Sequence, residues 1–318
     1  MTMRALRLAT IMIAAAVSMA APVAAQVQPE AAARIAAFGP VLNPDLVKAM
    51  HEVYNPLQPK SAPGIAMTGD LAYGADERQM LDVFAPEVKP ARPLPVVIFV
   101  HGGGFVAGAK RTPGTIMYQN VGLFYASSGM IGVVTTYRLA PKHPYPAGGE
   151  DVAASVRWVQ ANIARFGGDP GRIVLHGQSA GATHVGHYVF DKSLQPRDGR
   201  DGVIGAILQS AVFDPAGAPA GPNVTAYYGD PSKWDGTSQF DKLDGRAIPV
   251  LLLSSELNPE PFKRQFTRMQ EALCKRDGGR CPTAIEIAGH NHISEIFHLN
   301  SSDQSLGPAL LDFINSPK

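Results

Sequence analysis

The most constraining stretch of this sequence is a short apolar run that ends in a serine between glycines. Residues 173–175 read as a buried strand, and Gly177-Gln-Ser-Ala-Gly181 follows before a helix-length pattern begins. A serine on a sharp turn from strand to helix exposes its hydroxyl at the edge of the sheet. The flanking glycines fit a turn that is too cramped for a Cβ atom. A Gly/Ser-rich turn could match this pattern by chance, so its meaning depends on the rest of the chain.

Other strand-like runs around this stretch predict a parallel sheet. They are short, continuously apolar and rich in β-branched residues, as strands buried on both faces are. We expect strands at residues 95–100, 131–137, 173–175, 203–208, 250–253 and 284–287. The clearest helix-length pattern, residues 151–165, ends at Gly167-Gly168. This alternation predicts the α/β class, with an open, mostly parallel sheet and helices on both faces.

The segment before the core strands is predicted to be a leader to this single domain. Residues 26–63 carry an alanine-rich helical pattern interrupted by prolines, which predicts short helices. Residues 73–86 have alternating apolar positions and predict a hairpin at the edge of the sheet. We therefore expect residues 26–318 to form one domain, in which residues 26–70 are a small N-terminal cap.

The first 25 residues resemble a secretory signal peptide. Arg4 and Arg7 precede an apolar run at residues 9–20, and small residues follow up to Ala25. The run is shorter than the ~20 apolar residues that a membrane span needs, and no later run is long enough. We predict export to the periplasm or the medium after cleavage near Ala25. The chain has a net charge of +1 and no basic run, which argues against nucleic acid as a partner.

A run of three glycines follows the strand predicted at residues 95–100. In His101-Gly-Gly-Gly-Phe105, the glycines leave backbone N–H groups free to approach a ligand closely. Acyl transfer needs such donors to stabilise the oxyanion of its tetrahedral intermediate. We predict an oxyanion hole formed by the N–H groups of Gly103, Gly104 and Ala180. A merely flexible loop is the alternative for the glycines taken alone.

Four motifs together resemble those of α/β-hydrolases, in the hormone-sensitive-lipase-like carboxylesterase family. The motifs are His101-Gly-Gly-Gly-Phe105, Tyr137-Arg-Leu-Ala-Pro-Lys-His-Pro-Tyr-Pro146, Phe166-Gly-Gly-Asp-Pro170 and Gly177-Gln-Ser-Ala-Gly181. They cover about residues 73–182. The last third of the chain is more similar to the arylformamidase and feruloyl-esterase-like branch. The resemblance implies hydrolysis of an ester or related acyl bond through an acyl-enzyme on Ser179, without a cofactor.

A serine nucleophile needs a base that accepts its proton, and the base should follow the last strand. The family pattern places this base at His292, and His290 is the alternative. We interpret His176, His184 and His187 as packing or polar residues of a strand and a helix. They have no acidic or cysteine partner at ligand spacing, so no metal site is predicted.

The residue that orients the base departs from the family pattern. The family has an aspartate directly before a proline at this point, and this chain has Asn258. An asparagine can orient an imidazole but cannot stabilise the imidazolium by charge. We favour Glu256, in the same loop, as the third catalytic residue and keep Asn258 as the alternative. Glu260 and Asp214 are weaker candidates.

The remaining predictions concern the substrate and the two cysteines. Aromatic residues Phe105, Tyr227 and Tyr228 are candidates for the wall of the substrate pocket, although each could be ordinary packing. The modest cap favours small to medium esters over long-chain lipids. Cys274 and Cys281 are the only cysteines, and we expect them to pair in an oxidising compartment.

The sequence therefore predicts an exported serine carboxylesterase that acts on a small-molecule ester. An amide or formamide hydrolase is an alternative, because it would use the same catalytic residues. A ligand-binding relative without turnover is the alternative from another class, and Asn258 is its motivation. The sequence carries no indication of the oligomeric state.

Overall fold

A computed structural model of the chain describes residue 27, residues 29–219 and residues 221–316. The predicted signal peptide, residues 1–25, lies outside the described residues. Within the described part, no helix is both long and apolar enough to cross a membrane.

The described residues are organised around one eight-stranded sheet with the order β1-β2-β4-β3-β5-β6-β7-β8. The strands β3 to β8 pair in parallel, whereas β1 and β2 add an antiparallel edge. The strands are β1 (Ile65–Ala72), β2 (Met80–Pro86), β3 (Leu94–Val100), β4 (Ile131–Thr135), β5 (Gly168–Gln178), β6 (Val203–Gln209), β7 (Val250–Leu257) and β8 (Thr283–Asn291). The predicted α/β class and mostly parallel sheet are confirmed.

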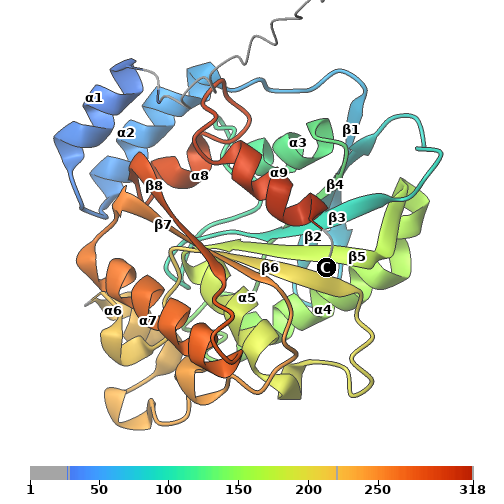
Figure 1. Cartoon of the computed structure of the whole chain (residues 1–318). Coiled ribbons are helices and arrows are strands. Elements are labelled where there is room, and N and C mark those ends of the chain that lie inside the picture. The colour runs from blue at the N-terminus through green and yellow to red at the C-terminus, as the bar shows by residue number, and fades with distance from the viewer. Residues whose placement is uncertain (1–26, 28, 220, 317–318) are drawn as a thin grey trace, which may run out of the picture.

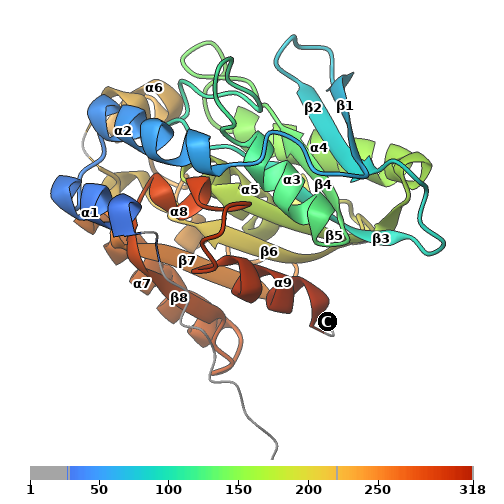
Figure 2. The ribbon, with the colours of Figure 1, turned by 90° about the horizontal axis from the view of Figure 1, so that it is seen from above.

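Helices cover both faces of the sheet (Figure 1). They are α1 (Pro29–Phe38), α2 (Pro44–Tyr54), α3 (Gln119–Ser127), α4 (Ala147–Asn162), α5 (Ala180–Phe190), α6 (Pro222–Tyr228), α7 (Glu260–Arg276), α8 (Ser294–Phe297) and α9 (Gly307–Asn315). Figure 2 shows α1, α2, α3, α8 and α9 over one face. The helices α4, α5 and α7 pack on the opposite face.

The core strands can carry helices on both sides because their apolar runs are continuous. Along β3, Val96, Ile98 and Val100 join the core shared with α4 and α5. Val97 and Phe99 face the core shared with α2 and α3. Successive side chains of a strand point to opposite faces, so an unbroken apolar run supplies both cores.

Two segments differ from their predicted boundaries. The edge hairpin was predicted at residues 73–86, but its first strand is β1, and residues 73–79 are the connection. Its register shifts between Thr68 and Leu71, which breaks the alternation that a strand prediction needs. The helix predicted at residues 151–165 begins four residues earlier, at Ala147, and continues as a 3₁₀ turn to Phe166.

The predicted leader, residues 26–70, joins the helical layer and contributes most of β1. Helix α2 packs against α8, and the Gln58 side chain donates to the carbonyl of Phe297 at 2.5 Å. Because α8 follows directly after His292, the leader supports the segment that carries this histidine. Its role as a cap over the active site stays a prediction.

Cys274 and Cys281 form a disulfide, as predicted. The bridge joins the last turn of α7 to the residues just before β8.

Candidate active site

Ser179 lies on a sharp turn between β5 and α5. Its backbone has φ 54° and ψ −124°, a left-handed conformation that is costly for a residue with a side chain. A Cβ atom at Gly181 would lie 2.0 Å from the carbonyl oxygen of Val100, so the helix can approach β3 only with glycine there. The close packing of α5 against β3 therefore explains one of the two flanking glycines, and the strained turn presents the serine hydroxyl.

His292 follows β8 and contacts the serine directly. Its Nε2 lies 2.9 Å from Ser179 Oγ, and its Nδ1 lies 2.7 Å from Asn258 Oδ1. An amide oxygen carries no hydrogen, so His292 Nδ1–H donates to it and Nε2 is left as an acceptor for the serine hydroxyl. Burial lowers the pKa of His292 to about 3, which keeps the ring neutral at ordinary pH. A neutral imidazole with a bare Nε2 is the form that a general base needs.

Asn258, and not Glu256, occupies the third position. The Glu256 side chain is exposed and accepts from the N–H of Gly289 at 2.7 Å, so it does not orient the imidazole. The register of β7 against β8 shifts between Ser255 and Leu257, which turns Glu256 away from the site. The preference for Glu256 is therefore corrected in favour of the alternative, Asn258.

The other candidates for the third position and for the base also lie elsewhere. Glu260 pairs with Arg264 at 3.6 Å, and Asp214 pairs with Arg268 at 3.1 Å. His290 does not contact Ser179 and pairs with Asp303 instead.

Two hydroxyls fix the amide of Asn258. Its Nδ2 donates to Ser210 Oγ at 2.7 Å and to Ser254 Oγ at 3.1 Å. Because both hydroxyls lie on the Nδ2 side, Oδ1 is directed to His292. Ser210 has φ 53°, so its backbone is also strained in order to place this hydroxyl.

A buried carboxyl group, Glu295, lies behind these residues and was not predicted from the sequence. Ser210 Oγ donates to Glu295 Oε2 at 2.8 Å, and Gln178 Nε2 donates to its Oε1 at 3.2 Å. The same Gln178 amide donates to the carbonyl of His292 at 2.9 Å. Burial raises the pKa of Glu295 to about 8, against the opposing effect of these hydrogen bonds. Glu295 is three residues after His292, but only the fold brings it beside Ser210.

The glycine run lies next to the serine because β3 and β5 are neighbours. Val100, the last residue of β3, is paired with Gly177. A Cβ atom at Gly102 would lie 3.2 Å from Ser179 Cβ, which shows how closely the loop approaches. Among the described residues, the N–H groups of Gly103 and Gly104 have no hydrogen-bond acceptor. The assignment of Gly103, Gly104 and Ala180 as oxyanion donors stays a prediction.

The three predicted pocket aromatics gather beside Ala180. Phe105, Tyr227 and Tyr228 form one small buried cluster, with Phe105 stacked on Tyr227 at 4.6 Å between ring centroids. A cavity of about 500 Å³, lined in part by Val106 and Ala140, adjoins this cluster. A second cavity, of about 530 Å³, is lined by charged residues such as Lys110, and neither cavity is lined by Ser179 or by the three aromatics.

The remaining histidines of this region have structural contacts. His176 lies between the Tyr125 hydroxyl and Gln209, and His184 and His187 are buried in α5. Within the described part of the chain, the side chains placed to hold a metal ion are His290, His298 and Asp303. None of the three belongs to the Ser179–His292–Asn258 group.

Comparison with known proteins supports the fold. Residues 97–228 match a family model described as alpha/beta hydrolase fold. The whole described fold resembles a hyperthermophilic esterase from Pyrobaculum calidifontis, with a TM-score of 0.67 and 20% identity over 91% of this chain and 97% of that one. Esterase B from Lactobacillus rhamnosis gives a TM-score of 0.67 and 18% identity over 90% of this chain and 95% of that one. The chain has the α/β-hydrolase fold.

Relatives that match part of this chain carry esterase names. Carboxylesterase NlhH of Mycobacterium tuberculosis is 46% identical over 88 residues, which are 28% of this chain and 26% of the relative. Esterase B1 of Culex pipiens is 36% identical over 123 residues, 37% of this chain and 23% of the relative. The matched segments thus span about a quarter of these relatives. The predicted resemblance to carboxylesterases is confirmed, and the likeness of the last third to the arylformamidase branch stays a prediction.

Proposed function

We propose that this protein is an exported carboxylesterase that uses Ser179 as its nucleophile. The observation that carries the proposal is the 2.9 Å contact between Ser179 Oγ and His292 Nε2, on a strained turn beside the glycine loop. The esterase names of its relatives support the same reaction class.

In the first half of the proposed reaction, Ser179 Oγ forms a bond to the carbonyl carbon of the ester. His292 Nε2 takes the serine proton, and the negative charge on the former carbonyl oxygen is stabilised by the N–H groups of Gly103, Gly104 and Ala180. The bond to the alkoxide then breaks, and His292 returns the proton to this leaving group. An acyl-enzyme on Ser179 remains.

In the second half, water attacks the acyl-enzyme. The water oxygen bonds to the acyl carbon while His292 accepts one proton of the water. The same N–H groups stabilise the oxyanion that forms. The carboxylic acid leaves as the Ser179 Oγ bond breaks, and the proton returns to Ser179. No redox group or metal ion takes part in this sequence.

In the proposed reaction, Asn258 assists His292 by orienting its imidazole and not by stabilising the positive charge that the imidazole gains. It fixes the tautomer and direction of His292, but it has no negative charge to stabilise the imidazolium formed in each step. Because burial also disfavours the charged ring, we expect slow turnover compared with a site that has aspartate at this position.

Hydrolysis of p-nitrophenyl acetate and butyrate by the mature protein tests the proposal. Wild type should turn over both esters, and Ser179→Ala should reduce turnover to the background rate. Ser193→Ala, at a serine outside the site, is the control that should retain wild-type activity. A silent wild type on every acyl length would contradict the esterase assignment and favour the ligand-binding alternative.

We further propose that the substrates are small to medium esters and that Phe105, Tyr227 and Tyr228 wall the pocket. The packing of these rings beside Ala180 supports a wall close to the reacting carbonyl. If an amide or formamide is the better substrate, a p-nitroanilide or N-formyl arylamine should exceed the matched ester in kcat/KM.

The signal-like pattern of the first 25 residues supports export. The mature N-terminus should be Gln26 in protein recovered from the periplasm or the medium. Retention of the full-length chain in the cytoplasm would contradict this part of the proposal.

A further inference from the structure

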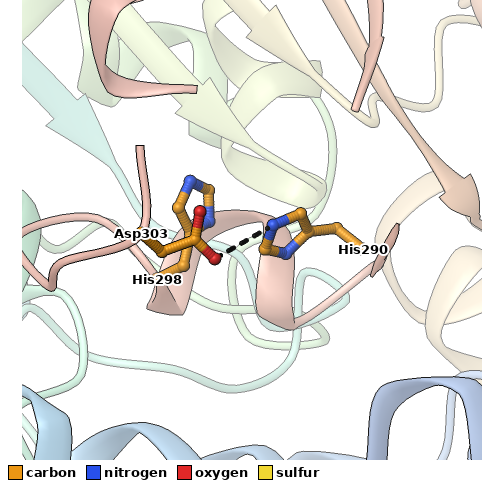
Figure 3. A group of neighbouring side chains, drawn as sticks. All are labelled: His290, His298 and Asp303. Carbon is orange, nitrogen blue, oxygen red and sulfur yellow. Dashed lines mark ion pairs between the residues drawn. The ribbon is translucent and has the colours of Figure 1, made fainter. Parts of the chain in front are cut away.

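His290, His298 and Asp303 converge in the interior from three consecutive pieces of the chain. His290 lies near the end of β8, His298 follows α8, and Asp303 belongs to the loop before α9. Figure 3 shows the carboxylate of Asp303 directed toward His290, and the His298 ring lies beside them with its centroid 4.3 Å from that of His290. The two histidines are fully buried and Asp303 is 4% exposed, so solvent does not satisfy their polar atoms.

One atom of each side chain has no hydrogen-bond partner among the described residues. These atoms are His290 Nε2, His298 Nε2 and Asp303 Oδ2. One potential ligand atom from each of the three side chains lies within 4.8 Å of the other two. His290 Nε2 and Asp303 Oδ2 are 3.4 Å apart, which is a loose ion pair if the histidine is protonated. Buried polar atoms are normally hydrogen-bonded, so three that have only one loose contact among them indicate a missing ligand.

The other atoms of the same side chains are held by neighbours. His298 Nδ1 lies 2.9 Å from the carbonyl oxygen of Ser294, and a carbonyl can only accept, so His298 Nε2 carries a lone pair. His290 Nδ1 lies 3.1 Å from Ser294 Oγ. Asp303 Oδ1 accepts from the N–H of Ser305 at 2.9 Å. Such outer contacts are what orient histidine and carboxylate ligands around a metal ion.

We propose that His290 Nε2, His298 Nε2 and Asp303 Oδ2 bind one divalent transition-metal ion of the zinc class. Two imidazoles and a carboxylate are a donor set that zinc accepts in protein sites, with water able to take a fourth position. Ligand atoms around tetrahedral zinc lie roughly 3.3 Å apart, given metal–ligand bonds of about 2.0–2.1 Å. Since one potential ligand atom of each side chain lies within 4.8 Å of the other two, only a small movement is needed to reach this spacing. The ion would replace the loose contact between His290 and Asp303 with three coordinate bonds.

The expected role of this ion is structural. It would join the end of β8, the end of α8 and the loop before α9, and His292 lies between the first two ligands in the sequence. Since none of the three ligands contacts Ser179, the site is independent of the proposed hydrolase activity. Binding and unfolding are therefore the appropriate measurements, and a failure of the esterase proposal leaves this inference unaffected.

The test uses the mature protein without an affinity tag, stripped with a chelator and titrated with Zn²⁺ alone. Wild type should bind one equivalent per chain with micromolar or tighter affinity, and its Tm should rise in excess Zn²⁺. Asp303→Asn, which keeps the shape of the side chain, should weaken binding at least 10-fold. His298→Gln should do the same, so the test stands if one variant fails to fold. The visible d–d absorption bands of Co²⁺-loaded wild type should be lost in both variants.

The matched control is Asp191→Asn, because His187 and Asp191 also form a buried histidine–aspartate pair, at 3.5 Å. Among the described residues, His187 and Asp191 are not part of a three-residue group that could hold a metal ion. Asp191→Asn should therefore bind Zn²⁺ as tightly as wild type. The proposal is overturned if folded wild type binds no stoichiometric Zn²⁺ at micromolar concentration. It is equally overturned if cooperatively folding Asp303→Asn and His298→Gln bind as tightly as wild type, since the ion then lies elsewhere.

Discussion

The contact between His292 and Asn258 determines how the imidazole can act. With an amide at this position, His292 is oriented but receives no help in becoming charged, and its buried surroundings lower its pKa further. Glu256 is close in the sequence, yet it lies at the surface and contacts the backbone of Gly289. Removal of each side chain should therefore have very different effects.

We predict that Asn258→Ala lowers kcat for p-nitrophenyl acetate by roughly 10²- to 10⁴-fold, because the imidazole loses its orientation. Glu256→Ala should stay within about 2-fold of wild type. Asn258→Asp should raise kcat above wild type, since a carboxylate stabilises the imidazolium and the hydroxyl of Ser254 can rotate to donate to it. Steady-state kinetics of the three variants measures this. Normal activity in Asn258→Ala, or a collapse in Glu256→Ala, would contradict the assignment.

Burial raises the pKa of Glu295 to about 8, so the stability of the protein should depend on the protonation of this carboxyl group. Between roughly pH 5 and 8, the folded protein keeps a proton that the unfolded chain releases, so the free energy of unfolding falls as pH rises through this range. Glu295→Gln cannot titrate and should lack this contribution, whose slope is at most about 1.4 kcal/mol per pH unit.

Urea unfolding at several pH values measures the difference between wild type and Glu295→Gln. The stability of the variant relative to wild type should increase steadily from pH 5 to pH 8. Glu256→Gln, at an exposed carboxylate, is the control and should run parallel to wild type. A constant difference between Glu295→Gln and wild type would contradict the buried, protonated state of Glu295.

At the scale of elements, the loop after β3 has a backbone conformation that requires glycine at residues 103 and 104. Gly103 has φ +128°, and a Cβ atom there would lie 2.1 Å from the carbonyl oxygen of Ala107. Gly104 has φ +59°, and its Cβ would meet the flexible side chain of Asn223 at 2.6 Å. The two positions therefore differ in what must move to admit a side chain.

We predict that Gly103→Ala reduces kcat by roughly 10²- to 10³-fold, the range for loss of one oxyanion donor, and lowers Tm more than Gly104→Ala does. Gly104→Ala should reduce kcat with a smaller loss of stability, because Asn223 can rotate away. Gly114→Ala is the control for backbone strain alone, since Gly114 has φ +76° and nothing within 4 Å. Equal Tm values for Gly103→Ala and Gly114→Ala would show that the predicted backbone clash is absent.

The disulfide belongs to the same scale, because it joins the end of α7 to the start of β8. Closing so short a loop should contribute roughly 2–3 kcal/mol to the free energy of unfolding. His292 follows the opposite end of β8, about 25–30 Å away along a strand of this length. Cys274→Ser with Cys281→Ser should therefore lower Tm by several degrees while kcat stays unchanged. Thermal unfolding and turnover of this double variant check both parts, and a large loss of kcat would contradict them.

The sequence predicted those elements whose signal lies in a few neighbouring residues. The apolar runs and glycine-flanked turns indicated the core strands, the turn at Ser179 and the glycine loop. The position of Asn258 relative to Glu256 was not predictable in this way, because a register shift in β7 decides which of two nearby side chains faces His292. Ser210 and Glu295 approach each other only because β6 and the segment after β8 meet in space.

At the scale of the whole molecule, the parallel order of β3, β5, β6, β7 and β8 brings the functional loops to one edge. The loops after β3, β5, β6, β7 and β8 supply the glycine run, Ser179, Ser210, Asn258 and His292, respectively. The carboxyl ends of parallel strands are where α/β sheets bind their ligands. The fold class could be predicted from the alternation of elements, but the convergence of His290, His298 and Asp303 could not, since it depends on the path of the chain after β8.

The central claim is that Ser179 forms an acyl-enzyme with His292 as its base. Rapid acid quenching of wild type during turnover of p-nitrophenyl acetate, followed by intact-mass and peptide mass spectrometry, tests it most directly. We predict a single acetyl adduct on the peptide that contains Ser179, more abundant in early than in late samples, and absent from Ser179→Ala. Steady turnover with no adduct on Ser179, or an equal adduct in Ser179→Ala, would contradict the account.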